Sequence, residues 1–288
     1  MTSKLYNNFK TVLFLGLLTG LILLAGQIIG GTTGLVIALV FAAATNFVSY
    51  FFSAKIALAS MGAQEVGPDH WLHQMVRRLA TRANLPMPKV YVSPQMAPNA
   101  FATGRNPQNS AVCATEGLLQ MLSRAEVAAV MGHELAHVKH RDILIQTVAA
   151  TIGGAISALG YVFMFGGSSE EDGESSNPIA GLLVLILGPI AAGLIQAAIS
   201  RSREFNADTE GAAIAGEPMD LATALEKIHA MSHQLPMDVN PAYNSLFIAE
   251  PTNVWRQMAN LFSTHPPVEQ RIANLIGRPW SGRVRTAA

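Results

Sequence analysis

The chain has 288 residues, of which 50% are hydrophobic and only 13% are charged, about half the usual charged share of soluble domains. The formal net charge is zero, which excludes the basic field of a nucleic-acid-binding protein. The single cysteine, Cys113, excludes an intrachain disulfide.

The first 52 residues are predicted to form a transmembrane hairpin. Two apolar runs, Val12–Gly30 and Leu35–Phe52, carry no charge and are separated by the short sequence GTTG. A helix needs about 20 apolar residues to cross a bilayer, and both runs approach this length. A buried soluble helix is the alternative for each run, and a cleaved signal peptide is a further alternative for the first.

Residues 53–142 are predicted to form the first part of a cytoplasmic domain. The stretch GPDHWLHQMVRRLATRANLP indicates an amphipathic helix that Pro86 stops. The runs KVYVSP, NAFATG and SAVCATEG are β-prone and separated by turn residues, which predicts a small antiparallel sheet. Ser123 and Glu126 have the spacing of a capping box, so a new helix is expected to begin at Arg124.

That helix carries the sequence VMGHELAHVKHRD, in which His133 and His137 lie one turn apart on the same face. Both imidazoles can reach one tetrahedral zinc ion. Glu134 stands beside the first histidine, where a carboxylate can act as general base toward a water molecule. The alternative is a polar helix face near a membrane surface.

His140 is a poor third ligand. It lies seven residues beyond His133, a rise of about 10.5 Å along a helix, so the three rings cannot meet on one ion. The metzincin spacing also fails, because it requires glycine at position 140 and histidine at position 143, which is Ile143 here. We interpret His140 as a solvated or headgroup-facing residue.

Residues 143–200 are predicted to form a second transmembrane hairpin. The apolar runs Ile143–Gly166 and Pro178–Ser200 flank an acidic loop, Gly167–Asn177, that is too polar for lipid and is expected to be solvated. Two glutamines and a proline in these runs leave a buried soluble helix open as an alternative. Pro189 is expected to kink the last helix.

Residues 201–288 are predicted to complete the cytoplasmic domain, and their first helix supplies the missing ligand. Glu204 would complete a His₂Glu site, and Asp208, one turn later, can accept the free ring N–H of a ligating histidine. The second hairpin brings this helix to the level of the first motif. An ordinary charged helix end, with Arg201 and Arg203 pairing locally, is the alternative.

The distribution of basic residues predicts the orientation. Residues 1–11, 53–142 and 201–288 hold two, nine and eight Lys and Arg, which are all nineteen, whereas the two opposite loops hold none. Both termini and the soluble parts are therefore expected in the cytoplasm. The predicted fold is mainly α with a small antiparallel β-sheet (α+β), with four transmembrane helices and a zincin-like domain.

In these motifs the chain resembles the HtpX family of membrane zinc metalloproteases, gluzincins related to the CAAX prenyl proteases. Two spans, NAFATG, GHELAHVKHRD, two more spans, SREFNAD and HPP follow one another in the order of that family over nearly the whole chain. The resemblance implies one zinc ion per subunit, with His133, His137 and Glu204 as ligands and Glu134 as catalytic base. It also implies substrate-side contributions from the NAFATG strand and the HPP segment.

Three further assignments concern the surroundings of the zinc site, the first of them by resemblance. His265 is the candidate second donor to the oxyanion, although a lone histidine before two prolines is more often structural. Arg203 is expected to pair near the site or to face the membrane surface. The candidate substrate strand, which could equally be an ordinary sheet edge, consists of Asn99, Ala100, Phe101, Ala102 and Thr103.

The function expected from these features is a zinc metalloendopeptidase of the bacterial inner membrane. It would hydrolyse misfolded or damaged membrane proteins in quality control, with the lipid bilayer as its surroundings and no nucleic-acid partner. A narrow processing peptidase resembling CAAX prenyl proteases and a catalytically silent zinc scaffold are the alternatives. A transporter or metal carrier is disfavoured because the predicted spans contain no Asp, Glu, Lys, Arg or His.

Overall fold

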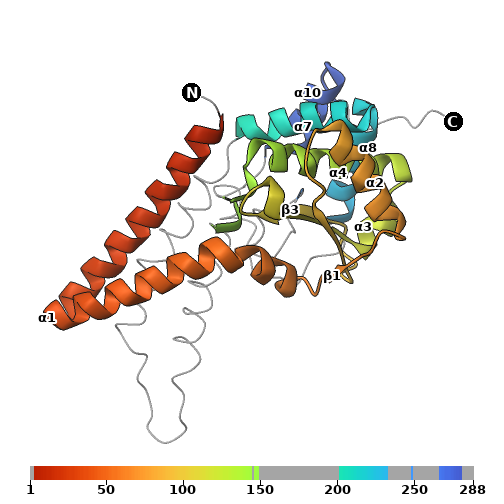
Figure 1. Cartoon of the computed structure of the whole chain (residues 1–288). Helices are drawn as coiled ribbons and strands as arrows, with labels where there is room; N and C mark the ends of the chain where they lie inside the picture. Colours follow the sequence, from red (N-terminus) through yellow and green to blue (C-terminus); the bar gives the residue numbers. More distant parts are fainter. Residues whose placement is uncertain (1–2, 145, 149–200, 233–247, 249–265, 281–288) are drawn as a thin grey trace, which may run out of the picture.

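The computed structural model describes residues 3–144, 146–148, 201–232, 248 and 266–280, and these are the coloured parts of Figure 1. The second predicted hairpin therefore lies almost wholly outside the described residues, and so does His265.

The N-terminal helix α1, Ser3–Ser60, turns back on itself half-way along its length. Figure 1 shows its two arms, red and orange, meeting at a tip far from the rest of the coloured chain. The turn lies at Gly30 and Gly31, where Gly31 has a φ of 55° that a glycine adopts without strain. A Cβ atom on Gly34 would lie 2.2 Å from the Gly26 carbonyl oxygen, so only glycine permits this approach of the arms.

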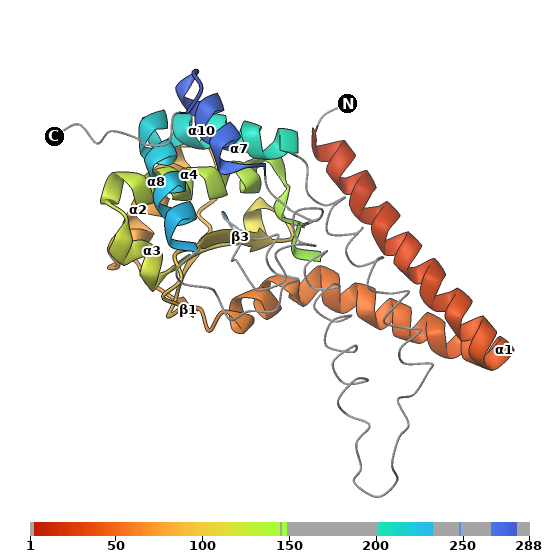
Figure 2. The ribbon, with the colours of Figure 1, turned by 180° about the vertical axis from the view of Figure 1, so that it is seen from behind.

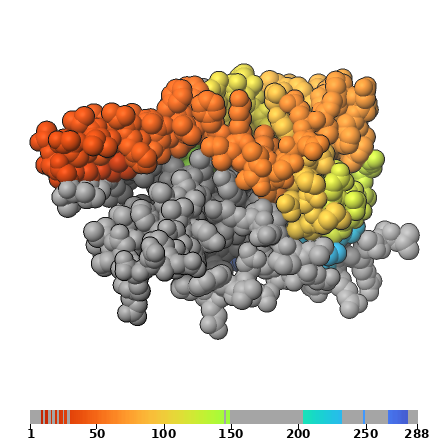
Figure 3. Space-filling model, turned by 90° about the horizontal axis from the view of Figure 1, so that it is seen from below, coloured from red at the N-terminus to blue at the C-terminus, as the bar shows by residue number. Residues whose placement is uncertain are grey.

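The second arm of α1 has the character of a membrane helix. Large apolar side chains such as Val36, Ile37 and Val40 are more than half exposed along it. Among the described residues, Gly30–Ser60 is the one helix long and apolar enough to cross a bilayer. Figure 3 shows this arm extending beyond the yellow and green part of the molecule. The expectation of four spans depends on residues outside the described ranges.

A four-stranded sheet forms one layer of the remaining chain. Its strands are β1 (Gln64–Glu65), β2 (Lys89–Ser93), β3 (Ala100–Gly104) and β4 (Ser110–Thr115), in the order β1-β2-β4-β3. β3 and β4 form an antiparallel hairpin across the short helix η1, Pro107–Asn109, and β2 pairs with the other edge of β4 in parallel.

The prediction of an antiparallel sheet is therefore wrong in part, because the sheet is mixed. The three β-prone runs are confirmed as strands, and β4 lies between β2 and β3. The β3–β4 hairpin fixes the direction of β4, and β2 then meets β4 running the same way. This arrangement leaves β3 at the edge of the sheet.

The helices cover this sheet with α4, Arg124–His140, at their centre. The predicted capping box of Ser123 and Glu126 is confirmed at its start. In Figures 1 and 2, α4 lies between β3 and α7, and α10 crosses the far side of α7. The other helices are α2 (Trp71–Arg82), α3 (Glu116–Met121), α7 (Arg201–Ala215), α8 (Pro218–Ser232) and α10 (Val268–Ile276).

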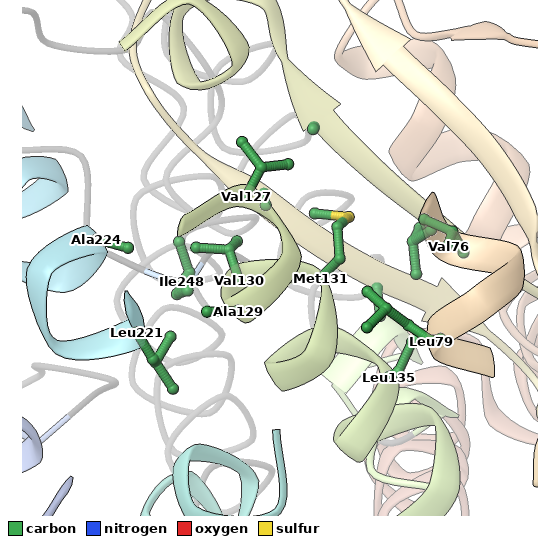
Figure 4. Close-up of a cluster of buried hydrophobic side chains, with 14 of the residues drawn as sticks. Val76, Leu79, Val127, Ala129, Val130, Met131, Leu135, Leu221, Ala224 and Ile248 are labelled. Atoms are coloured by element: carbon green, nitrogen blue, oxygen red, sulfur yellow. The ribbon is translucent and has the colours of Figure 1, made fainter. Parts of the chain in front are cut away.

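The hydrophobic core lies on both sides of α4. Val130 and Met131 are fully buried, and Figure 4 shows Val130 facing Leu221 of α8 while Leu135 faces Leu79 of α2. Burying a side chain of this size contributes about 1.5–3 kcal/mol. The helix that carries the two motif histidines is thus held rigidly from several directions, which a precise metal site requires.

Candidate metal centre

The two motif histidines extend from the same face of α4 and meet at their tips. The Nε2 atoms of His133 and His137 are 3.1 Å apart, and both side chains are buried. Two zinc–nitrogen bonds of about 2.05 Å at a tetrahedral angle place their nitrogen atoms about 3.3 Å apart. The spacing of the rings is therefore close to that of a pair of zinc ligands.

Glu204 reaches the same point from α7. Its carboxylate oxygens lie 3.8 Å from Nε2 of His133 and 3.6 Å from Nε2 of His137. The three ligand atoms lie within 4.8 Å of one another, the single such group that could hold a metal within the described parts of the chain. Two imidazoles and one carboxylate are the protein ligands of one type of catalytic zinc site.

Two glycines allow α4 and α7 to approach closely beside these ligands. A Cβ atom on Gly132 would lie 2.5 Å from the carbonyl oxygen of Gly211, and one on Gly211 would lie 2.5 Å from Cα of His133. Neither backbone could accommodate such contacts. The close packing of α4 against α7 is what brings Glu204 within reach of the histidines.

His133 is oriented by Asp208, which lies one turn after Glu204 on α7. Nδ1 of His133 is 2.9 Å from Oδ1 of Asp208, so it donates to the carboxylate and leaves Nε2 free to bind a metal. Arg271 of α10 holds Asp208 from the other side, with Nε and Nη2 donating over 2.9 and 2.6 Å. Burial raises the pKa of Asp208, but Arg271 outweighs it and lowers the pKa to about 2.

His137 has a carboxylate partner of its own. Its Nδ1 is 3.2 Å from Oδ2 of Asp142, and Nη1 of Arg203 lies 3.6 Å from the other carboxylate oxygen. Burial lowers the pKa of His137, but the charges of Glu204 and Asp142 more than compensate and raise it to about 9. Without a metal, this ring is therefore protonated at neutral pH.

Glu134 lies beside the two ligands and is 2% exposed. Burial raises the pKa of its carboxyl group. The neighbouring histidines and a hydrogen bond from the backbone N–H of Ala102 oppose this shift but do not cancel it. A buried carboxylate with an elevated pKa is suited to accept a proton near neutral pH.

The remaining predicted residues lie in different surroundings. Nε2 of His140 is 2.6 Å from Oε2 of Glu210 on α7, and Lys139 forms an ion pair with the same carboxylate. His140 thus stands outside the metal group, as predicted, and it is an inter-helix partner more than a solvated or headgroup-facing side chain. Residues 99–103 are buried along the edge strand β3 and adjoin α4.

Sequence reasoning missed Asp142 and Arg271. Arg141 adopts a left-handed φ of 61° that ends α4, and this turn directs Asp142 back toward His137. Arg271 had a detectable signal, because it occupies the apolar face of α10 together with Val268 and Ile272. A buried charge on an apolar face requires a partner of opposite charge.

Comparison with known proteins agrees with this geometry. The family model for peptidase family M48 matches residues 67–278. The chain belongs to peptidase family M48. A protein named Protease HtpX homolog from Burkholderia ambifaria is 52% identical over 284 residues, covering 97% of this chain and 99% of the relative. Relatives of the same name from Burkholderia cenocepacia and Paraburkholderia phytofirmans are 51% identical over the same length.

The fold also resembles that of a solved structure, Ste24p of S. mikatae. The TM-score is 0.50 at 18% identity, over 94% of this chain and 66% of that one. The resemblance to HtpX proteins predicted from the sequence is therefore confirmed. The chain is a zinc metalloprotease, a hydrolase, and its described part contains a His-His-Glu site.

Proposed function

We propose that this metalloprotease is an integral membrane endopeptidase that hydrolyses misfolded or damaged membrane proteins at the cytoplasmic face of the bacterial inner membrane. The observation that carries the proposal is the buried group of His133, His137 and Glu204, with Glu134 beside it. The apolar arm Gly30–Ser60 supports a membrane location.

In this proposal His133, His137 and Glu204 hold the zinc ion. Zinc in such a site lowers the pKa of a water molecule and polarises the carbonyl group of a peptide bond. Asp208 and Asp142 fix the ring tautomers, and Arg203 supports Asp142.

Glu134 is the proposed general base. It takes a proton from the attacking water and delivers it to the leaving amine, while burial keeps its carboxylate poorly solvated and basic. His265 remains the proposed second donor to the oxyanion, on the basis of the family resemblance alone. The edge strand Asn99–Thr103 is the proposed surface on which the substrate backbone pairs.

The proposed topology divides the chain into four parts. Residues 1–52 and 143–200 are two transmembrane hairpins, and residues 53–142 and 201–288 combine into the cytoplasmic protease domain. The absence of Lys and Arg from the two opposite loops supports this orientation. Unfolded membrane segments would then reach the site from the bilayer surface.

Glu134→Gln tests the proposed function. The purified full chain, loaded with zinc, is incubated with an unfolded membrane protein, with a chelator as control. The variant should keep its zinc and fold while peptide cleavage falls by about 10²–10⁴-fold, the usual contribution of a general base.

The matched control is Glu210→Gln, which removes the half-exposed carboxylate that pairs with Lys139 and His140 between α4 and α7, and it should cleave normally. Full activity of Glu134→Gln would contradict the mechanism. Cleavage of one short sequence only, with unfolded membrane proteins spared, would favour a narrow processing peptidase over quality control.

A further inference from the structure

The second arm of α1 carries a belt of exposed aromatic side chains, Tyr50–Phe52, near its end. Tyr50, Phe51 and Phe52 are 36–46% exposed, and the ring centres of Tyr50 and Phe51 are 4.9 Å apart. Ser49 and Ser53 are buried, so this stretch of helix turns small side chains inward and rings outward. Tyrosine is enriched at the boundary between a bilayer and water, and phenylalanine suits the apolar side of that boundary.

The length of α1 places this aromatic belt at one boundary of a bilayer. Phe51 lies 20 residues after the turn at Gly31, a rise of about 30 Å along a helix. On the first arm, Lys10 lies equally far before the turn at Gly30. The hydrocarbon core of a bilayer is also about 30 Å thick. With the tip of the hairpin at one boundary, the belt therefore lies at the other.

Two cations lie over the rings of the belt. Nζ of Lys55 is 5.6 Å from the ring centre of Phe52, and the guanidinium of Arg105 is 5.2 Å from that of Phe51. Neither cationic side chain forms an ion pair or a hydrogen bond with any residue in the described ranges. A cation–π contact leaves most of the five N–H donors of arginine available, and these donors match the oxygen atoms of a phosphate group.

Arg105 belongs to the protease domain and not to α1. It follows Gly104, the last residue of β3, and that strand adjoins α4 with its two motif histidines. In the same strand, Oγ1 of Thr103 is 3.0 Å from Oγ1 of Thr147, near the start of the third apolar run. A group that binds Arg105 at the boundary would therefore hold the sheet, and with it the metal centre, at the membrane surface.

We propose that Lys55 and Arg105 bind the phosphate group of an anionic phospholipid, whose acyl chains lie along the aromatic belt. This inference goes beyond the peptidase activity and rests only on the membrane location proposed above. An anionic phospholipid fits both features of the site, because its phosphate complements the two cations and its chains complement the exposed rings. The cytoplasmic leaflet carries the negative surface potential that attracts such cations.

The test titrates the purified full chain in detergent with phosphatidylglycerol and, in parallel, with phosphatidylcholine of the same acyl chains. Native mass spectrometry counts the bound lipids and gives both dissociation constants. We expect the unaltered chain to bind phosphatidylglycerol more tightly. Lys55→Gln and Arg105→Gln should each reduce this preference about fivefold, the effect of one cation near an anionic surface, while the zinc content stays unchanged.

Arg105→Lys keeps the charge and should retain most of the preference. Arg78→Gln, which removes an exposed arginine on α2, is the matched control and should bind both lipids as the unaltered chain does. Equal affinity of the unaltered chain for both lipids, or an unchanged preference in the double variant of Lys55→Gln and Arg105→Gln, overturns the proposal.

A soluble competitor tests whether the ligand must be a lipid. Glycerol phosphate at the concentration of the lipid should leave phosphatidylglycerol bound, because it has no acyl chains to contact the belt. Displacement by glycerol phosphate would indicate a soluble phosphate ligand and overturn the lipid assignment. Lipid binding requires no cleavage, so an inactive chain that keeps the preference would remove the proposed peptidase function alone.

Discussion

His133 and His137 lie one turn apart on α4, yet each is oriented by a different region of the molecule. Asp208 holds His133 at 2.9 Å, and Arg271 of α10 grips Asp208 with two hydrogen bonds. Asp142 holds His137 at 3.2 Å, and Arg203 approaches Asp142 only to 3.6 Å. The first arrangement is tighter and deeper than the second.

The difference follows from where the two aspartates lie. Asp208 is in the middle of α7, and its partner Arg271 comes from α10, the last of the described helices. Asp142 precedes the helix that opens the third apolar run, and its carbonyl accepts the N–H of Gln146 in the first turn. One ring is thus fixed by the packing of α7 against α10, and the other by the turn between α4 and the third apolar run.

The largest expected effect on stability comes from breaking the ion pair of Asp208 and Arg271. Arg271→Leu leaves the carboxylate of Asp208 buried without its cation, which usually costs about 3–5 kcal/mol. The free energy of unfolding in detergent should fall by this amount. Arg278→Leu, an exposed arginine just beyond α10, is the control and should change stability by less than about 0.5 kcal/mol.

A double variant separates the structural role of this pair from its effect on the metal. Asp208→Leu with Arg271→Leu removes both charges, so part of the lost stability should return. Zinc affinity should stay about 10–100-fold below normal, because His133 has lost its acceptor. Recovery of zinc affinity together with stability would show that Asp208 does not orient the ring.

The pH dependence of zinc binding reports on His137 and its partner Asp142. Because the metal-free pKa of His137 is raised to about 9, zinc must displace a proton at neutral pH. Affinity should therefore rise with pH, about 50-fold between pH 7 and 9 for one released proton, and level off above. Competition against a chelator with known pH dependence measures this, and a flat profile over that range would refute it.

A smaller effect is expected from Asp142→Ser. Serine can still cap the following helix but cannot accept the ring N–H of His137 as a charged partner. Zinc affinity should fall about tenfold, at the lower end of the range for such partners, because the native contact is long. The rise of affinity with pH should also begin to level off at a lower pH. A loss as large as that of the Asp208 double variant would remove the asymmetry.

The sequence brought His133, His137 and Glu204 together as one group because the residues around them obey a helical period. His133 and His137 are separated by one turn, and Glu204 and Asp208 repeat that spacing on α7, so a face of each helix could be assigned. Asp208 was expected to orient one of the two rings, and the structure pairs it with His133. No rule of spacing could decide between the rings.

Other features depend on contacts between distant segments. Arg271 is separated from Asp208 by 63 residues, and Ile248 is separated from its hydrogen-bond partner Asn99 by 149. The insertion of β4 between β2 and β3 is likewise set by how the hairpin docks, because a parallel partner and an antiparallel partner require the same alternation of residues. Asp142 was visible in the motif, but its direction depends on the left-handed turn at Arg141.

The central claim is that one zinc ion is held between α4 and α7, by the two histidines and by Glu204. Metal analysis of purified Glu204→Ala, beside Glu210→Ala from the same helix, tests it most directly. We predict about one zinc per chain in the unaltered protein and in Glu210→Ala, and a large loss in Glu204→Ala. Unchanged zinc content in Glu204→Ala would contradict the account.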